Sequence, residues 1–267
     1  MGHHAVVGPA DFRSQEAILG QIRRSFPQSW CMTEERLTRR YPTLRPVTQR
    51  TLSRAMRDRV FVIDELDGSS ANAAGHYEWC TSVACVEAME HTAGAVCAPD
   101  IWRGVVFFAG GRTNGAASLR GHSVGSLQVV RAELRNAYVL LGPDLLIKEF
   151  SRLLNGTLQI VNRARTANIS NSCALGMAMV AAGKAHLIIE PPQRPWDWAA
   201  GYRLITSAGG TVLFYRIDER GIYRVDAPTV ADYNPSARAL GFVAGAHPLV
   251  EQAFRLFEDS FRLQRGI

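Results

Sequence analysis

Hydrophobic residues recur at helical spacing near the start of the chain. Ile18, Ile22 and Phe26 stand four residues apart, so they fall on one face of a helix. This spacing predicts an amphipathic helix over residues 14–26. Pro27 ends it, because proline cannot continue the hydrogen-bond ladder of a helix.

Short runs of β-branched and aromatic residues replace this pattern further along the chain. Residues 60–63, Val-Phe-Val-Ile, predict a buried strand that runs directly into Asp64. Three further strands are expected at 81–86, 94–97 and 104–108. Because only brief segments with glycine or asparagine separate these strands, they are expected to pair antiparallel.

The second half of the chain alternates more regularly between strands and helices. Strands are expected at 137–141, 186–189, 211–215 and 242–244. Helices are expected at 145–154, 174–182, 197–207 and 248–263. A run of strands followed by such alternation favours layered sheets and helices in two lobes.

Composition narrows the class of protein. Of the 267 residues, 47% are hydrophobic and 20% are charged, as in soluble globular proteins. No apolar stretch approaches the roughly 18 residues of a membrane span. The first residues lack the basic start and the apolar run that follow one another in a secretory signal. The five cysteines show no C-x-x-C spacing, which favours a reducing compartment, so we expect a cytoplasmic protein.

The strongest chemical signal is Asp-Glu-Leu-Asp-Gly-Ser-Ser, at the end of the first predicted strand. Asp64 and Asp67 offer the oxygen ligands that Mg²⁺ prefers, and the carbonyl of Leu66 adds a neutral oxygen between them. Gly68 permits a tight turn. The same pattern is also typical of an Asx turn or a helix cap, so both interpretations stay open at this point.

Three other acidic signals are weaker when each is taken singly. Asp197 opens a predicted helix, where the helix dipole favours a carboxylate, and Asp11 stands just before another helix. The pair Glu34-Glu35 is typical of a solvated surface. A structural explanation therefore suffices for each of these signals alone.

Taken together, the motifs follow the order and spacing of a known family. They are Ala10-Asp11, Glu34-Glu35, the 64–70 segment, Glu190, Trp196-Asp197 and Ser207-Ala-Gly-Gly-Thr. The chain resembles the inositol monophosphatase family over residues 10 to about 215. The resemblance implies an α+β fold, a layered α/β/α/β sandwich. One domain over 1–267 is expected, with an N-terminal lobe of about 1–140 and a C-terminal lobe of about 141–267.

The resemblance also implies roles for particular residues. The metal ligands would be Glu34, Asp64, Leu66 through its carbonyl, Asp67 and Asp197, holding two or three Mg²⁺ ions. The catalytic residues would be Asp11, Glu34 and Ser69. The substrate would contact Gly68, Ser69, Ser70, Asn171, Ser172 and Glu190. Because paired ions lie about 4 Å apart, the Asp64 and Asp197 carboxylates are expected within about 10 Å of each other.

The chain departs from the family pattern in several places. Only ten residues precede Asp11, so the front helix of the family is expected to be missing. Glu65 replaces the usual proline and adds a negative charge beside the ligands. Thr33 replaces the glycine before the Glu pair, and residues 171–174 read Asn-Ser-Cys-Ala where the family has Gly-[ST]-Ala-Ala.

The prediction that results is a Mg²⁺-dependent phosphomonoesterase. Its substrate would be a small polyol or sugar phosphate, inositol monophosphate by default, attacked by a metal-activated water. The alternative is a catalytically impaired descendant of the fold that acts as a binding or regulatory module. The missing front helix, Glu65 and the changed 171–174 segment motivate that alternative. No membrane partner is expected, and a homodimer is left open.

Arginines are concentrated in one segment. Between Arg36 and Arg59, eight arginines stand against one acid, Asp58. One interpretation is a solvated surface loop whose arginines reflect codon usage. The other is a segment that loops out at the mouth of the cleft and attracts phosphorylated substrates. Nucleic acid is not expected as a partner, because aromatic residues other than Tyr41 are not interleaved with the arginines.

Overall fold

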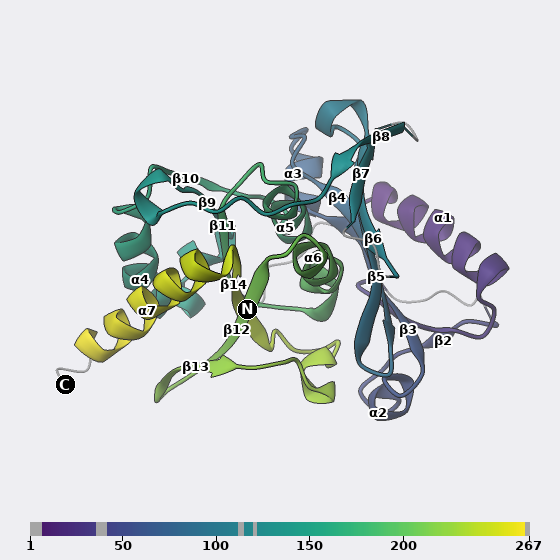
Figure 1. Cartoon of the computed structure of the whole chain (residues 1–267). Helices are drawn as coiled ribbons and strands as arrows, with labels where there is room; N and C mark the ends of the chain where they lie inside the picture. The colour runs from purple at the N-terminus through teal and green to yellow at the C-terminus, as the bar shows by residue number, and fades with distance from the viewer. Residues whose placement is uncertain (1–6, 36–41, 112–114, 120–121, 265–267) are drawn as a thin grey trace.

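The chain folds into stacked layers of helices and sheets in the computed structural model, which describes residues 7–35, 42–111, 115–119 and 122–264. Figure 1 shows helix α1 (Pro9–Ser25) outside the first sheet, and helices α5 (Cys173–Ala181) and α6 (Pro195–Ser207) between the two sheets. Helices α4 (Ser151–Val161) and α7 (His247–Gln264) cover the outer face of the second sheet. The expected layered α/β/α/β arrangement is confirmed, with one further helical layer outside it.

The first sheet has eight strands in the order β2-β1-β3-β4-β5-β6-β7-β8. Its strands are β1 Trp30–Thr33, β2 Arg45–Pro46, β3 Arg59–Asp67, β4 Cys80–Glu87, β5 Glu90–Ala98, β6 Val105–Gly110, β7 Ala116–Leu119 and β8 His122–Ser126. Strands β3 to β8 pair antiparallel, as expected, but β1 lies parallel to β3 with Thr33 opposite Ile63. The end of β1 therefore lies beside the last part of β3, so Glu34, which follows β1, comes next to Asp64 of β3.

The second sheet has six strands in the order β10-β9-β11-β14-β12-β13. Its strands are β9 Tyr138–Leu141, β10 Thr166–Ile169, β11 Leu187–Gln193, β12 Thr211–Asp218, β13 Gly221–Val225 and β14 Leu240–Gly245. The first sheet ends at Ser126 and the second begins at Tyr138. The lobe boundary expected near residue 140 thus falls inside β9, which belongs wholly to the second sheet.

The helix expected over 145–154 is wrong in its first half. Two short 3₁₀ turns, Pro143–Leu146 and Lys148–Phe150, precede α4, which begins only at Ser151. Ile147 separates the turns with an extended backbone (φ −81°, ψ 152°), so a continuous helix cannot pass through it. The remaining α-helices among the described residues are the short α2 (Leu52–Ala55) and α3 (Ser69–Ala73), and three further 3₁₀ turns lie at Ile101–Arg103, Leu134–Asn136 and Val230–Tyr233. No described helix combines the length and the apolar character that crossing a membrane requires.

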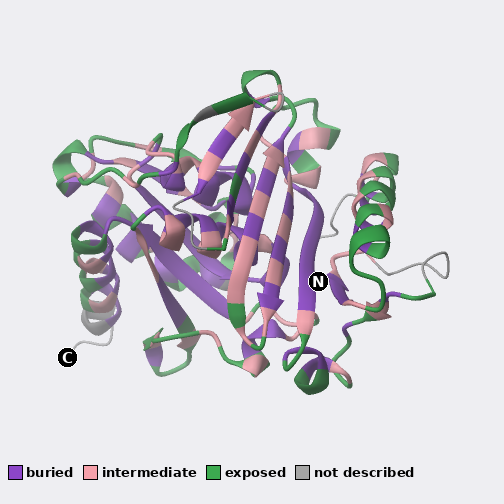
Figure 2. Cartoon of the chain, turned by 45° about the vertical axis from the view of Figure 1, so that its right-hand side comes forward, coloured by how far each residue is buried: buried purple, intermediate pink, exposed green. Residues whose placement is uncertain are grey.

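The layer between the two sheets is almost wholly buried. Eight of the nine residues of α5 are buried, and strand β4 alternates buried and half-buried positions as it faces this layer on one side (Figure 2). Helix α6 lies very close to strand β5. A Cβ atom placed on Gly94 would lie only 2.7 Å from the carbonyl oxygen of Ala200. The absence of a side chain at position 94 therefore lets α6 rest directly on the sheet.

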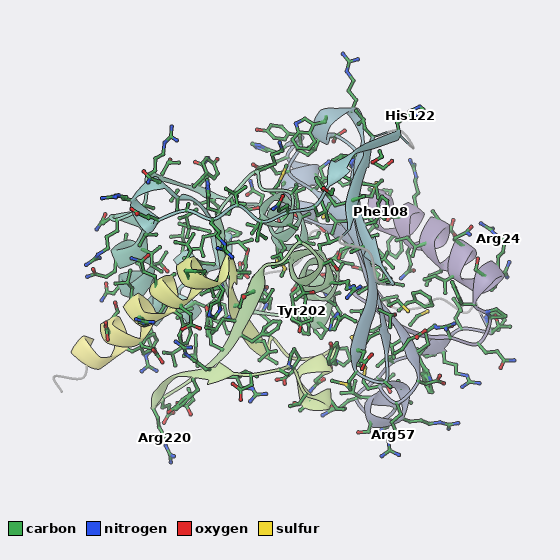
Figure 3. All side chains as sticks on the ribbon, in the orientation of Figure 1. Arg24, Arg57, Phe108, His122, Tyr202 and Arg220 are labelled. Atoms are coloured by element: carbon green, nitrogen blue, oxygen red, sulfur yellow. The ribbon has the colours of Figure 1, made fainter. Side chains whose placement is uncertain are left out.

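The described part of the arginine-rich segment lies far from the cleft that it was expected to border. Arg45 pairs opposite Trp30 on β2, and Arg59 begins β3, so both lie at the opposite end of the strands from Asp67. Nine strand residues separate the two ends by about 26 Å. Figure 3 shows Arg57 beside α2 at that far end. The expectation is therefore wrong for residues 42–59, while Arg36, Arg39 and Arg40 lie outside the described residues.

Candidate metal-dependent active site

The turn after β3 places two aspartates where the sheet meets the central helices. Asp64 and Asp67 belong to the last part of β3, and Gly68 follows with a left-handed backbone, φ 93°. A Cβ atom at position 68 would lie 2.8 Å from the carbonyl oxygen of Glu78, so glycine is required on two counts. The backbone N–H of Leu66 donates a hydrogen bond to Asp64 Oδ1 at 3.0 Å, which fixes that carboxylate.

A cluster of carboxylates forms at this turn. One oxygen from each of Asp64, Asp67 and Asp197 lies within 4.8 Å of the others. The expectation that Asp64 and Asp197 lie within about 10 Å is confirmed. Asp64 and Asp67 are only 1% and 9% exposed. The carboxyl of Glu34, which follows β1, shares a hydrogen bond with Asp64 and makes the cluster four-membered.

Burial and mutual repulsion raise the pKa values of these carboxyls. Burial raises the pKa of Asp64 well above its ordinary value, and the charges of Glu34 and Asp67 raise it further. Burial is also the largest cause for Glu34, whose pKa rises to about 7, and for Asp67, whose pKa rises to about 6. Four such groups can all be ionised at neutral pH only if a cation compensates them.

The donor set suits a hard divalent cation. All the converging ligand atoms are oxygens, which Mg²⁺ prefers over nitrogen or sulfur donors. The carbonyl of Leu66, expected as a further ligand, accepts a hydrogen bond from the hydroxyl of Ser69 at 2.7 Å. A carbonyl oxygen has two lone pairs, so that bond leaves one of them available. Glu34, Asp64, Asp67 and Asp197 therefore fit a metal site.

The residues expected to be catalytic lie beside the cluster. The Ser69 hydroxyl is 3.3 Å from Asp11 Oδ1, across 58 residues of sequence. Asp11 is 5% exposed, and its other oxygen accepts the backbone N–H of Gly8 at 2.8 Å in the first turn of α1. Asp11 therefore serves both as a helix-capping carboxylate and as a neighbour of Ser69. The capping interpretation and the catalytic interpretation of this residue are compatible.

A cavity of about 420 Å³ opens in front of the cluster. Gly68, Ser69, Ser70, Asn171 and Glu190, all expected to contact substrate, line it. Glu190 is fully buried, and its Oε2 accepts a hydrogen bond from Gln193 at 3.1 Å. Its Oε1 has no hydrogen-bond partner among the described residues.

Ser172 does not line this cavity, which corrects the expectation that it contacts substrate. It is 1% exposed, and its hydroxyl donates to Asp67 Oδ2 at 2.8 Å. The same hydroxyl accepts the backbone N–H of Leu175 at 3.2 Å and so caps helix α5. Ser172 therefore supports a carboxylate of the cluster from behind.

Sequence reasoning missed several polar residues around the site. Arg194 and Arg238 line the cavity. Burial raises the pKa values of Glu34 and Asp197, and the charges of Arg194 and Arg238, respectively, oppose part of that rise. Arg238 forms an ion pair with Asp144 at 2.5 Å. The position of Arg194 next to the Trp196-Asp197 motif was a usable signal. Arg238 follows a long irregular segment, and nothing near it in the sequence indicates a site.

Fold and site together define a layered α+β protein with a buried carboxylate cluster for hard cations. The sequence model of the inositol monophosphatase family matches residues 2–240. The chain belongs to the inositol monophosphatase family.

Named relatives fall into two groups. The chain is 31% identical to the protein named Nus factor SuhB of Xylella fastidiosa over 195 residues, which cover 71% of this chain and 66% of that one. It is 29% identical to the fructose-1,6-bisphosphatase/inositol-1-monophosphatase of Thermotoga maritima over 220 residues, 79% of this chain and 72% of that one. The name Nus factor does not describe a phosphatase. It also does not fit the expectation that nucleic acid is not a partner.

Solved structures share the fold at low sequence identity. The extragenic suppressor protein SuhB of Bartonella henselae superposes with a TM-score of 0.72 at 19% identity, covering 96% of this chain and 86% of that one. An IMPase of Thermotoga maritima gives a TM-score of 0.71 at 22% identity, covering 97% and 86%. At these identities the likeness shows the fold alone.

Proposed function

We propose that the protein is a Mg²⁺-dependent phosphomonoesterase that acts on a small polyol or sugar phosphate. The observation that carries the proposal is the convergence of Asp64, Asp67 and Asp197 within 4.8 Å, at the mouth of a cavity of about 420 Å³. Phosphate esters hydrolyse very slowly in water, so a site must supply both a nucleophile and charge neutralisation. Bound Mg²⁺ would supply a water of lowered pKa and would neutralise the phosphate oxygens.

The residues around the cluster would orient the reactants. The Ser69 hydroxyl donates toward Leu66 or Asp11, so its lone pairs are free to accept a hydrogen bond from a water in the cavity. Glu34, which also lines the cavity, would accept a proton from that water. The backbone N–H groups of Ser69 and Ser70, in the first turn of α3, would bind phosphate oxygens.

Glu190 and Asn171, which also line the cavity, would bind the alcohol part of the substrate. The unpartnered Oε1 of Glu190 can accept a hydrogen bond from a substrate hydroxyl. Asn171, whose side chain donates to Glu78 at 2.6 Å, would border the same hydroxyls. A cavity of about 420 Å³ suits a single sugar or cyclitol ring with its phosphate. These features support inositol monophosphate or a similar polyol phosphate as the substrate.

Phosphate release tests the proposal directly. Para-nitrophenyl phosphate and inositol monophosphate are assayed with Mg²⁺ and again after chelation. Turnover that depends on Mg²⁺, with inositol monophosphate preferred over the aromatic ester, is the expected result. Turnover that survives complete chelation would contradict the metal-dependent mechanism.

A regulatory or binding module is the second candidate, and the relatives named Nus factor SuhB are the observation that favours it. In that case the fold and the carboxylate cluster persist while hydrolysis is lost. The same protein would then bind a divalent cation yet release no phosphate from any member of a substrate panel. That combination of results would replace the phosphatase proposal.

A further inference from the structure

A buried polar network lies behind the carboxylate cluster, on the side away from the cavity. Glu65 is 1% exposed and Gln15 is 2% exposed, and neither was expected to have a role. The amide nitrogen of Gln15 donates to Glu65 Oε1 at 2.9 Å. Fifty residues separate the two in sequence, so the contact joins helix α1 to the strand that carries Asp64.

Both side chains of this network also reach the same residue, Glu35. The amide of Gln15 donates to the backbone carbonyl of Glu35 at 3.0 Å. The backbone N–H of Glu35 donates to Glu65 Oε2 at 3.4 Å. Residue 35 is thus held at its N–H and at its C=O, in the segment directly after strand β1. The Thr33 hydroxyl adds a third bond, to the same carbonyl at 2.5 Å.

Glu34 directly precedes the residue that these hydrogen bonds hold. It lies between the end of β1 at Thr33 and the fixed peptide of Glu35, so its backbone has little freedom. Its carboxyl shares a hydrogen bond with Asp64. Without the network, the Thr33 hydroxyl is the one remaining partner that the described residues offer to the backbone of Glu35. The carboxyl of Glu34, repelled by the neighbouring carboxylates, could then move toward solvent. The network therefore opposes the electrostatic repulsion that would open the cluster.

We propose that Gln15 and Glu65 are positioning residues that hold Glu34 in the carboxylate cluster by clamping the backbone of Glu35. The proposal rests on the proposed function only in taking Glu34 as a metal ligand. Helix α1 then contributes to the site twice, one turn apart. Asp11 contacts Ser69, and Gln15 holds the segment that carries Glu34.

Two substitutions and a matched control test this clamp. Gln15→Met keeps the volume of the side chain and removes its hydrogen bonds. Glu65→Gln keeps the shape and can still accept from Gln15, but it turns an amide toward the N–H of Glu35. Gln21→Met makes the same change as the first variant at an exposed position of α1, where Gln21 contacts only its own helix.

Two readouts are measured on folded protein, well below each variant's Tm. The first is the exchange rate of the Glu35 backbone amide in metal-free protein, followed by NMR. It is expected to rise at least about tenfold in Gln15→Met. The second is affinity for Mn²⁺ by electron paramagnetic resonance. It is expected to fall about tenfold in Gln15→Met and less in Glu65→Gln, as for other residues that orient metal ligands. Gln21→Met should match the wild type in both.

The outcomes separate this inference from the proposed function. Unchanged Glu35 exchange together with unchanged Mn²⁺ affinity in Gln15→Met overturns the clamp and leaves the phosphatase proposal standing. Failure of the wild type to bind Mn²⁺ overturns the proposed function, while the exchange measurement still decides whether the clamp exists. A lower Tm in Gln15→Met with both readouts unchanged would show that the network only stabilises the fold, which also overturns the proposal.

Discussion

The two ends of strand β3 carry opposite charges, and they differ in whether those charges have partners of opposite sign. At its end, Asp64 and Asp67 join Asp197 with oxygens within 4.8 Å of one another. At its start, Arg59 forms an ion pair with Glu87 and stacks over the ring of Phe26 at 4.9 Å. A cavity of about 530 Å³ lies at this basic end, larger than the one of about 420 Å³ at the acidic end.

Cavity size alone therefore does not identify the functional site. At the basic end the charges find partners within the protein, since Arg45 stacks over Trp30 at 5.5 Å and Arg59 has its carboxylate. At the acidic end like charges face one another in a buried setting, and their pKa values rise as a result. Such an arrangement is destabilising unless a cation joins it, which is why we assign the proposed function to that end.

Substitution of Asp64, at the acidic end of β3, should reduce activity more than any other change considered. In Asp64→Asn, kcat/KM for Mg²⁺-dependent phosphate release is expected to fall at least about 10³-fold, because a central ligand of the cation is lost. The metal-free Tm should stay the same or rise. Asn can still accept the N–H of Leu66, and one of the repelling charges is gone. Phosphate release and calorimetry measure the two effects, and retention of most activity would exclude Asp64 from the site.

The response to Mg²⁺ should depend on pH. Burial raises the pKa of Asp67 from 3.8 to about 6 and that of Glu34 from 4.5 to about 7. Between these values the metal-free folded state binds more protons than the unfolded state. The stability that these groups contribute is therefore present below about pH 4 and is lost as the pH rises to about 7.

Bound Mg²⁺ should offset that loss only where the carboxyls are ionised. Mg²⁺ at 100 times its Kd is expected to stabilise the protein by about 2.7 kcal/mol at pH 8. The effect should vanish near pH 5, because protons compete for the same oxygens. Calorimetry with and without Mg²⁺ at both pH values makes the measurement. An equal rise in Tm at pH 5 would place the cation at another site.

Changes at the basic end should have the smallest effect on catalysis. Replacing Arg45, Arg57 and Arg59 together with Gln should leave kcat unchanged, and likewise the slope of log kcat/KM against ionic strength. Arg59 begins β3 five residues before Asp64, about 16 Å from the cluster along the strand, which is beyond the Debye length of about 8 Å at physiological salt. A flatter slope in the triple variant would show that these arginines attract substrate after all.

Much of the fold was predictable because it depends on local pattern. The helices at α5, α6 and α7 and the strands β3 to β6 follow from periodicity and from their glycine and proline boundaries. Strand β1 was missed, because Trp30–Thr33 is only four residues long and is a strand only through its parallel pairing with β3. The interruption at Ile147 was missed for a similar reason, since no glycine or proline marks it.

The site was predictable where its members stand in motifs, and not where they act across the fold. Asp64, Asp67 and Asp197 lie in recognisable sequences, and the structure brings them together. The hydrogen bonds of the Ser172 hydroxyl join it to the helix that it caps and to Asp67, which is 105 residues away, so the sequence around Ser172 does not show them. Gln15 and Glu65 meet across fifty residues. Glu65 stood out only as a departure from the family pattern, and nothing in the sequence connected it with Gln15.

The near-contact between Gly94 and Ala200 has a consequence for how finely the metal cluster is adjusted. Ala200 lies one helical turn after Asp197, so the depth at which α6 rests on β5 sets the gap between Asp197 and the two aspartates of the sheet. A methyl group at position 94 would push the helix outward by several tenths of an ångström, since it would start only 2.7 Å from a carbonyl oxygen. Metal–ligand distances tolerate only about 0.2 Å. Gly94, which has no side chain of its own, would thus set the spacing of the carboxylates proposed to bind the cation.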